Sequence, residues 1–453
     1  MDGELPVEWK VASVTPLFKA GNILDVNNYR PVSILPTVSK LAERVVCDQL
    51  VHYLMSCDII CPEQHGFRPA HSTESALLDA VSYISSNVNS GQVVSLIAAD
   101  TSKAFDSVEH GRLREKLGWY GIDTWWFSDW LCDRKQVVKG GCRSLSVSHG
   151  VVQGSILGPV LFSVFTNDLP SHVPCGKLVM YADDTQFLNT CKRTSLGQHS
   201  AELESMLSVV QAWYNQNCLR INPSKTELIL FGNDHAPDIS VQFGGALVKA
   251  CNKVKILGVM IDSRLQWVDH VSLVVRRCYS TLSGLAKFSH RLPSSVKRLV
   301  IESLVLPHIL YCVTVWGGCN ETQKHRVQKI LNHAAQIVFG SSRRAHVTPL
   351  LAQLEWQNVH SLIRERDILT LHRLTHLPHA PVNVKQLLVH RSAVSCRSTR
   401  AVEAGLLHLP RVHSERARRH FCYRAAKHWN EAPVVVREPG TVATCRKRLR
   451  SHQ

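Results

Sequence analysis

The strongest constraint on the fold comes from two apolar segments that each run into carboxylates. Residues 93–99 (VVSLIAA) form an apolar, strand-like run that stops at Asp100. Residues 178–188 predict two short strands around Asp183 and Asp184, because Asp favours tight turns. If the first strand lies beside this hairpin in one sheet, Asp100 lies next to Asp183. The pattern therefore predicts a sheet that gathers three carboxylates.

Three such carboxylates are suited to binding metal ions. Adjacent carboxylates repel each other unless a cation compensates them, and hard oxygen ligands suit Mg²⁺. Asp100 and Asp183 could bridge two Mg²⁺ ions about 4 Å apart, the arrangement used for in-line phosphoryl displacement. Asp184 is expected to support them, because three bridging ligands would overcrowd small octahedral ions. The YADD segment alone could equally be an Asp-rich turn.

The remaining pattern indicates mixed α/β structure up to residue 262 and mainly helices after it. Residues 102–106 look like the start of a helix, and residues 202–217 carry apolar side chains at helical spacing. Residues 226–231 and 254–261 read as strands. No repeat of fixed period occurs, which argues against a solenoid.

The charge balance points to an anionic partner. The 453 residues contain 52 Lys and Arg against 36 Asp and Glu, a formal charge of +16. Residues 391–453 alone hold 14 Lys and Arg and four Glu, a net +10. Such a surplus attracts polyanions such as nucleic acid, and Tyr423, His428 and Trp429 are expected to stack on unpaired bases. The alternative is a helix packed on its neighbours with solvated charges.

Cysteine usage and hydropathy favour an intracellular chain without a membrane segment. The 15 cysteines are scattered and include no CxxC pair, which favours reduced thiols. The first residues, MDGELPVEWK, lack the apolar part of a secretory signal. The most apolar long stretch, residues 299–316, contains Glu302, Pro307 and His308 and reads as a buried helix and turn.

Several segments in a fixed order resemble the reverse transcriptases of non-LTR (LINE-type, jockey-like) retrotransposons. The resemblance covers residues 6 to about 262, and the segment HWNEAPVVVRE near Trp429 more weakly resembles the region that follows the polymerase in jockey-like elements. The segments are VNNYRPVSILPTVSKLAERVV, EQHGFRPAHSTESAL, AADTSKAFDSVEH, GVVQGSILGPVLFSVFTNDLP, YADDTQ, INPSKTELILF and VKILGVMID.

The resemblance implies an α+β right-hand polymerase. Fingers and a palm with an antiparallel sheet are expected in residues 1–262, a helical thumb in 263–345 and a basic helical region in 346–453. It implies an RNA-directed DNA polymerase that takes an RNA template, a DNA primer, deoxynucleoside triphosphates and two Mg²⁺ ions. A catalytically inactive nucleic-acid-binding relic and a group II intron-type maturase stay as alternatives.

The resemblance also implies roles for individual residues. Asp100, Asp183 and Asp184 match the catalytic, metal-binding carboxylates. Lys225 of NPSKTE matches a lysine that assists pyrophosphate departure as a general acid, although it could be a surface lysine. Phe105 matches the aromatic steric gate that excludes ribonucleotides, although it could be a core residue. The other residues expected to bind substrate are Arg68, Gln153, Gly154, Tyr181 and Gly258.

These substrate contacts have distinct expected partners. The Arg68 guanidinium suits triphosphate oxygens, and Arg30 of NYRP is a weaker candidate that could instead form a structural ion pair. Gln153 and Gly154 belong to a loop that touches template and incoming nucleotide. Gly258, with Leu257, belongs to a turn that supports the primer end.

The chain departs from the family pattern in two respects. Val152 stands where the family usually has Pro, which should loosen that loop without removing a ligand. The polymerase motifs begin only a few residues after the start of this sequence, so we expect the endonuclease domain of such elements to be missing. We therefore expect a fragment of a longer element.

Overall fold

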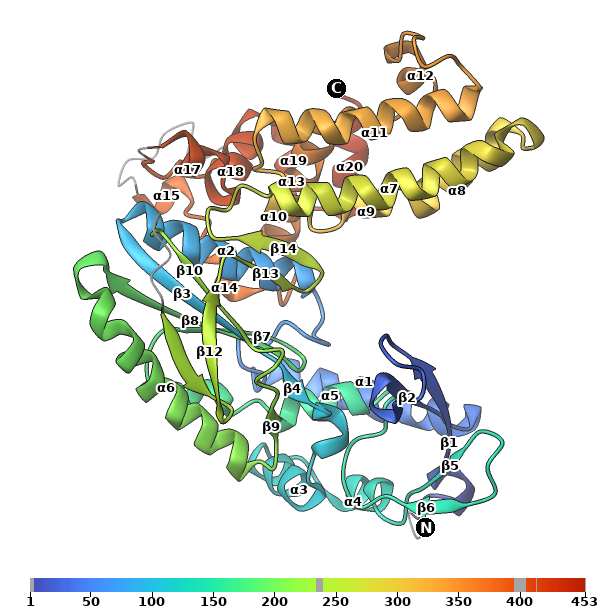
Figure 1. The fold of residues 1–453 in the computed structure, drawn as a ribbon, viewed down its shortest axis with the longest axis vertical. Helices are drawn as coiled ribbons and strands as arrows, with labels where there is room; N and C mark the ends of the chain where they lie inside the picture. Colours follow the sequence, from blue (N-terminus) through green and yellow to red (C-terminus); the bar gives the residue numbers. More distant parts are fainter. Residues whose placement is uncertain (1–3, 234–238, 395–404, 413, 453) are drawn as a thin grey trace.

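The computed structural model describes residues 4–233, 239–394, 405–412 and 414–452. The ribbon is shaped like the letter C (Figure 1). A large sheet and its helices form the middle, the first strands form one arm, and the helices that follow residue 268 form the other arm. This arrangement is that of a right-hand polymerase, with palm, fingers and thumb.

The palm is a six-stranded sheet with the strand order β11-β12-β10-β3-β8-β7. Neighbouring strands are antiparallel except β10 and β12, which are parallel. Its central strand is buried on both faces, as expected from its apolar run. The strands are β3 (Gln92–Ala99), β7 (Lys177–Tyr181), β8 (Asp184–Lys192), β10 (Glu227–Phe231), β11 (Ser240–Phe243) and β12 (Ala246–Cys251).

Helices cover both faces of the palm sheet. Val93 and Ile97 of β3 pack in one core with α5 (Gly158–Phe165) and α6 (Leu196–Gln216). Val94 and Leu96 face the opposite way, into a core that includes α2 (Thr73–Asn89). This alternation of β3 side chains places the strand between two separate layers of helices.

The fingers combine a four-stranded sheet of order β2-β1-β5-β6 with one long helix, α1, and two shorter ones. β1 pairs antiparallel with β2 and parallel with β5, so this sheet joins the start of the chain to residues 135–146. The elements are β1 (Val11–Phe18), β2 (Tyr29–Ile34), α1 (Thr37–Ser56), α3 (His110–Trp119), α4 (Trp125–Leu131), β5 (Lys135–Val138) and β6 (Ser144–Ser146).

The thumb and the C-terminal region are helical and share one core with α2. A continuous set of buried side chains runs from α2 to the last helix, and it crosses both boundaries expected after residues 262 and 345. Those boundaries stay predictions. The main helices are α7 (Val268–Phe288), α8 (Ser294–Leu304), α10 (Val313–Trp316), α11 (Glu321–Phe339), α13 (Val359–His376), α17 (Glu415–Arg419), α18 (Phe421–Glu431) and α20 (Val442–Arg450).

Two local predictions are wrong. The helix start expected at residues 102–106 is a short strand, β4 (Thr101–Ser102), followed by a 3₁₀ turn, η3 (Ala104–Ser107). The strand expected at residues 254–261 is a hairpin of β13 (Lys253–Ile256) and β14 (Val259–Asp262). In both places the backbone turns at a residue with positive φ, Lys103 in the first and Leu257 in the second.

The helix expected at residues 202–217 begins earlier, at Leu196. Residues 299–316, expected as a buried helix and turn, span the end of α8, α9 (Leu306–Leu310) and α10, and Leu299 and Leu304 are exposed. Within the described residues, no helix has the length and apolar character needed to cross a membrane. All cysteines in that part of the chain are unpaired.

Candidate active site

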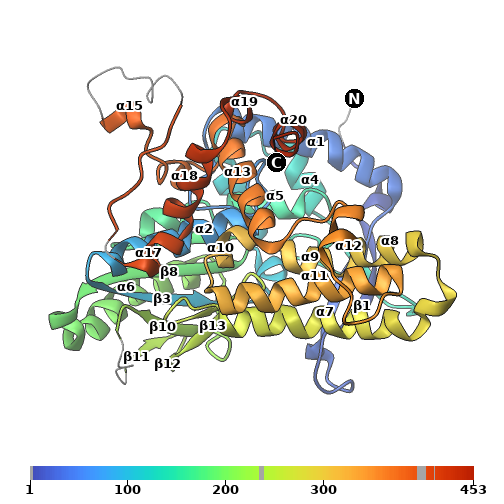
Figure 2. The same cartoon turned by 90° about the horizontal axis from the view of Figure 1, so that it is seen from above.

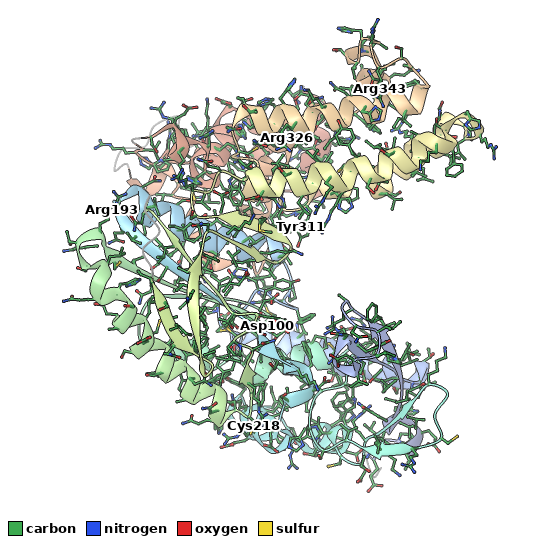
Figure 3. All side chains as sticks on the ribbon, viewed as in Figure 1. Asp100, Arg193, Cys218, Tyr311, Arg326 and Arg343 are labelled. Atoms are coloured by element: carbon green, nitrogen blue, oxygen red, sulfur yellow. The ribbon has the colours of Figure 1, made fainter. Side chains whose placement is uncertain are left out.

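The palm sheet brings the three predicted carboxylates together. β3 and β8 are antiparallel with Ala99 opposite Thr185, and the β7–β8 turn closes with Tyr181 opposite Asp184. Asp100, directly after β3, therefore lies beside the turn that carries Asp183. Figure 3 shows Asp100 on the concave side of the C.

The charges of these carboxylates oppose one another. Burial raises the pKa of Asp183, and the charge of Asp100 raises it further. Burial, together with the charges of Asp183 and Asp100, raises the pKa of Asp184 to about 6. A bound cation would relieve this repulsion. The nearest ammonium, Lys225 Nζ, lies 3.7 Å from Asp100 Oδ2, and it is exposed, so this pair compensates the site only weakly.

The carboxylates of this site fit a divalent ion whose coordination shell is completed by substrate. In the described part of the chain, no group of three or more His, Cys, Asp or Glu is placed to hold a metal ion. Mg²⁺ typically takes one or two carboxylates and completes its octahedron with water and substrate phosphates. Asp100 and Asp183 supply carboxylates of that kind, with Asp184 next to them.

Gln64, which the sequence analysis did not single out, holds the β7–β8 turn. Its Oε1 accepts hydrogen bonds from the backbone N–H of Ala182 at 3.0 Å and of Gly66 at 2.7 Å. Ala182 has a φ of +56° and is the residue between Tyr181 and Asp183. A Cβ on Gly66 would lie 2.3 Å from the Ala182 nitrogen, so only glycine permits this contact.

The same segment is anchored along β7. The His65 N–H donates to the Met180 carbonyl at 2.8 Å, and the Met180 N–H donates to the Glu63 carbonyl at 2.9 Å. A sequence signal was available, because Gln64 and Gly66 belong to the EQHGFR segment of the family resemblance. Their contact with the turn depends on residues about 118 positions later in the chain, which no local pattern shows.

Arg68 is half-buried in its own loop. Its Nη1 donates to the Cys61 carbonyl at 3.0 Å, and burial lowers its pKa. The neighbouring Phe67 lies edge-on to Phe105, with ring centroids 6.4 Å apart. The structure thus connects the HGFR loop to Phe105 through an aromatic contact.

Phe105, five residues after Asp100, is held by packing on the core. Its ring stacks on Phe162 of α5 with centroids 4.6 Å apart, and its carbonyl accepts from the Val151 N–H at 2.8 Å. The ring is only half-buried, so one part anchors it in the core and the other part is exposed. This geometry is compatible with both the gate and the core interpretations.

The loop of Gln153 and Gly154 is tied to the fingers sheet. Gln153 Nε2 donates to Asp106 Oδ1 at 2.8 Å, and Arg30 Nε donates to Gln153 Oε1 at 3.3 Å. The Ser33 N–H donates to the Gln153 carbonyl at 2.8 Å. Gly154 has a φ of +118°, and a Cβ there would lie 2.3 Å from the Ser33 oxygen. Arg30 therefore positions Gln153.

The β13–β14 turn is fixed by the thumb. Leu257 and Gly258 both have positive φ, and the Tyr311 hydroxyl donates to the Leu257 carbonyl at 2.7 Å. The same hydroxyl lies 3.2 Å from Thr73 Oγ1 of α2. Tyr311 and Asp100 both lie on the concave side of the molecule (Figure 3). The turn expected to support the primer end is thus held near the carboxylates by a tyrosine that the sequence analysis did not identify.

The predicted stacking role of the C-terminal aromatic residues is wrong for Trp429, and for His428 it stays a prediction. The Trp429 side chain is buried, and its Nε1 donates to the Gly405 carbonyl. His428 Nδ1 lies 2.9 Å from Asp367 Oδ2. The Trp429 ring is therefore used to pack the helices, whereas Tyr423 and His428 both remain partly exposed.

Comparison with known proteins agrees with this site. Residues 19–261 match the family described as reverse transcriptase (RNA-dependent DNA polymerase), and the chain belongs to that family. Its relatives are polymerases of non-LTR retrotransposons. It is 29% identical over 359 residues to a probable RNA-directed DNA polymerase from transposon BS of Drosophila melanogaster, covering 74% of this chain and 38% of that protein.

Two further likenesses extend this comparison. The chain is 27% identical over 342 residues to the RNA-directed DNA polymerase from mobile element jockey of Drosophila melanogaster, covering 72% of this chain and 37% of the relative. The chain thus spans less than half the length of these relatives. Among solved structures, apo telomerase from Candida tropicalis is 13% identical, with a TM-score of 0.46 over 85% of this chain and 64% of that one.

Proposed function

We propose that this chain is the polymerase part of a non-LTR retrotransposon protein and copies an RNA template into DNA. The observation that carries the proposal is the convergence of Asp100, Asp183 and Asp184 where β3 meets the β7–β8 turn. The substrates are an RNA template, a primer with a 3′-hydroxyl and deoxynucleoside triphosphates.

The chain's own residues have separate tasks in this reaction. Asp100 and Asp183 would hold two Mg²⁺ ions, and these ions would supply electrostatic stabilisation of the reacting phosphate oxygens. Asp184 adds negative charge beside them. Lys225, whose exposed Nζ is free to leave Asp100, donates a proton to the departing pyrophosphate.

The surrounding residues orient the substrates. Gln153 presents its amide to the base pair that forms, and Arg30 and Asp106 fix the orientation of that amide. The exposed part of Phe105 contacts the sugar. The Leu257–Gly258 turn supports the primer end, and Arg68 contacts the triphosphate after leaving the Cys61 carbonyl. Catalysis then consists mainly of positioning and electrostatics.

Primer extension on an RNA template tests the proposal. The unchanged chain should extend a DNA primer with Mg²⁺, and Asp183→Asn should abolish extension while RNA binding persists. Asp48→Asn, which removes an exposed carboxylate from α1, serves as the matched control and should extend normally. Lack of extension by the unchanged chain would favour the inactive relic, and substantial extension by Asp183→Asn would contradict the metal assignment.

A further inference from the structure

A second basic concavity lies away from the carboxylates, on the outer side of the C-terminal helices. This outer basic pocket has a volume of about 540 Å³ and lies where α11, α13, α17 and α18 meet. α18 packs on α2, and α2 packs on β3, so α2 separates the pocket from the palm sheet (Figure 1). Seen from above, α17 and α18 lie at the opposite end of the molecule from α8 (Figure 2). Its principal side chains are Lys324, Arg364, Arg418, Arg419, Tyr423 and Lys427.

The charges around this pocket are strongly unbalanced. Six Lys and Arg line it against one acidic residue, Glu431. Lys324 is paired with Glu321 at 2.8 Å, and Lys427 lies 3.8 Å from Glu431. Within the described residues, Arg364, Arg418 and Arg419 form no ion pair, which leaves three guanidinium groups for an external anion.

Two of these guanidinium groups also carry unused donors. The Nε–H groups of Arg364 and Arg419 are buried and have no hydrogen-bond partner in the described part of the protein. A buried donor without an acceptor is costly, so such groups need an explanation. A phosphate provides several acceptor oxygens and suits the planar guanidinium.

The floor of the pocket is rigid. Arg424 Nε and Nη2 donate to the two oxygens of Asp367 at 2.7 and 2.9 Å, and Nη1 donates to the Arg419 carbonyl at 2.8 Å. This buried pair fixes the corner between α17 and α18. The backbone that carries Arg418 and Arg419 is therefore in place before a ligand binds, which lowers the entropic cost of binding.

An aromatic ring accompanies the charges. Tyr423 lines the pocket and is only half-buried, one turn of α18 before Lys427. Basic side chains that contact a phosphate, together with an aromatic face that stacks on a base, are the combination with which proteins hold single strands. A flat anionic membrane would not reach into a concave site of this kind.

We propose that the outer basic pocket binds an unpaired nucleotide of a nucleic-acid strand, with its phosphate on the arginines and its base on Tyr423. This site goes beyond the proposed polymerase function, because it lies outside the concave side and needs no catalysis. It gives the chain a second binding site for a long template or for the displaced strand.

Salt-dependent binding of short single strands tests the charge part of the proposal. The matched variants are Arg364→Gln/Arg418→Gln in the pocket and Arg193→Gln/Arg343→Gln, two exposed arginines elsewhere on the surface (Figure 3). Each pair removes two charges. The pocket variant should flatten the slope of log Kd against log salt by about 0.7, because it loses its contact with the one bound phosphate and each phosphate contact on a single strand contributes about 0.7. Equal slopes for the two variants would overturn the proposal.

Photo-cross-linking tests the stacking part and identifies the source of the nucleotide. RNA and DNA oligomers that carry 5-iodouracil should both cross-link to Tyr423. The oligomer with the higher cross-linking yield identifies the kind of strand that the pocket binds. Tyr423→Ala should weaken binding by about tenfold, and Tyr423→Phe should restore it, because stacking needs only the ring.

Cross-links that avoid Tyr423 would overturn the proposal. So would a phosphopeptide or anionic vesicles that displace the oligomer from the pocket at equal phosphate concentration. Neither assay involves nucleotide incorporation, so failure of the polymerase proposal would be visible separately.

Discussion

Among single residues, Asp184 shows that negative charge at the β7–β8 turn lowers the stability of the metal-free protein. Its pKa is raised to about 6, first by burial and then by the charges of Asp183 and Asp100. Because the folded protein then binds this proton more tightly than the unfolded chain, metal-free stability falls as pH rises from about 4 to about 6. Asp184→Asn should therefore raise the free energy of unfolding at pH 7 by on the order of 1 kcal/mol, because the residue keeps part of its surface in solvent, which screens the repulsion.

Urea unfolding in EDTA measures this gain. It should be present at pH 7 and largely absent at pH 4, where the wild-type carboxylate is protonated in the folded protein and about half protonated in the unfolded chain. Adding Mg²⁺ at pH 7 should stabilise the wild type more than Asp184→Asn. A gain that is the same at both pH values would show that charge at the turn is not its cause.

Phe105 is the residue for which the two interpretations differ most in their consequences. If its exposed part contacts the sugar, Phe105→Ala removes a clash with the 2′-hydroxyl of a ribonucleotide only, and changes the ratio of efficiencies. Steady-state kcat/KM for matched ribonucleotides and deoxynucleotides should show roughly tenfold or greater loss of discrimination. Phe162→Leu, which removes the stacking partner from the core, is the control and should lower stability without a comparable change in that ratio.

At the scale of elements, the β7–β8 turn depends on a segment more than a hundred residues earlier in the chain. Gln64→Ala leaves the N–H groups of Ala182 and Gly66 without their acceptor, at a cost of about 1–3 kcal/mol for a buried donor. As a positioning residue, Gln64 should affect kcat far more than the KM for nucleotide. Gln336→Ala, which alters a buried glutamine of α11, should lower stability and leave kcat unchanged. Equal kcat for the two variants would reduce Gln64 to a structural role.

The elements that could be predicted from the sequence are those with a regular apolar pattern. Apolar residues alternate or form continuous runs in β3, β7 and β8. The pairing of these strands explains why Asp100 lies beside Asp183. The apolar run over residues 254–261 reads as one strand although the resemblance implies a turn at Leu257 and Gly258, and the turn before η3 was missed because its bend lies at Lys103, a non-glycine residue with positive φ. Nothing in the side chain of lysine indicates that conformation. Gln64 was missed because its partner is distant in sequence.

At the scale of the whole molecule, charge counts misjudge the basic C-terminal region. Its net +10 predicts an exposed tail for nucleic acid, yet several of its arginines hold the fold together. Arg437 donates to main-chain carbonyls, including that of Ala432 at 2.7 Å, and Arg446 and Arg450 lie within 3.3 Å of Glu365. A sequence shows how many charges there are, but which of them face solvent depends on packing between α13, α18 and α20.

The buried pair of Asp367 and Arg424 ties this region to the rest of the molecule. Arg424 of α18 bonds to Asp367 of α13 and to the Thr314 carbonyl of α10, and Thr314 in turn bonds to Glu74 of α2 at 2.5 Å. Asp367→Ala leaves a buried guanidinium without its counter-charge and should cost about 3–5 kcal/mol. Asp269→Ala, which breaks an exposed pair with Lys253, is the matched control and should cost at most about 1 kcal/mol.

Thermal and urea unfolding distinguish this role of Asp367 from a local one. Because α18 packs on α2, undocking it would expose part of the core shared by palm, thumb and C-terminal region. Asp367→Ala should therefore lower the midpoint of a single transition that also includes the palm. The double variant Asp367→Leu/Arg424→Met should recover much of the loss, since an apolar pair leaves no buried charge unpaired. A separate early transition, with the palm transition unchanged, would instead show that the C-terminal helices unfold on their own.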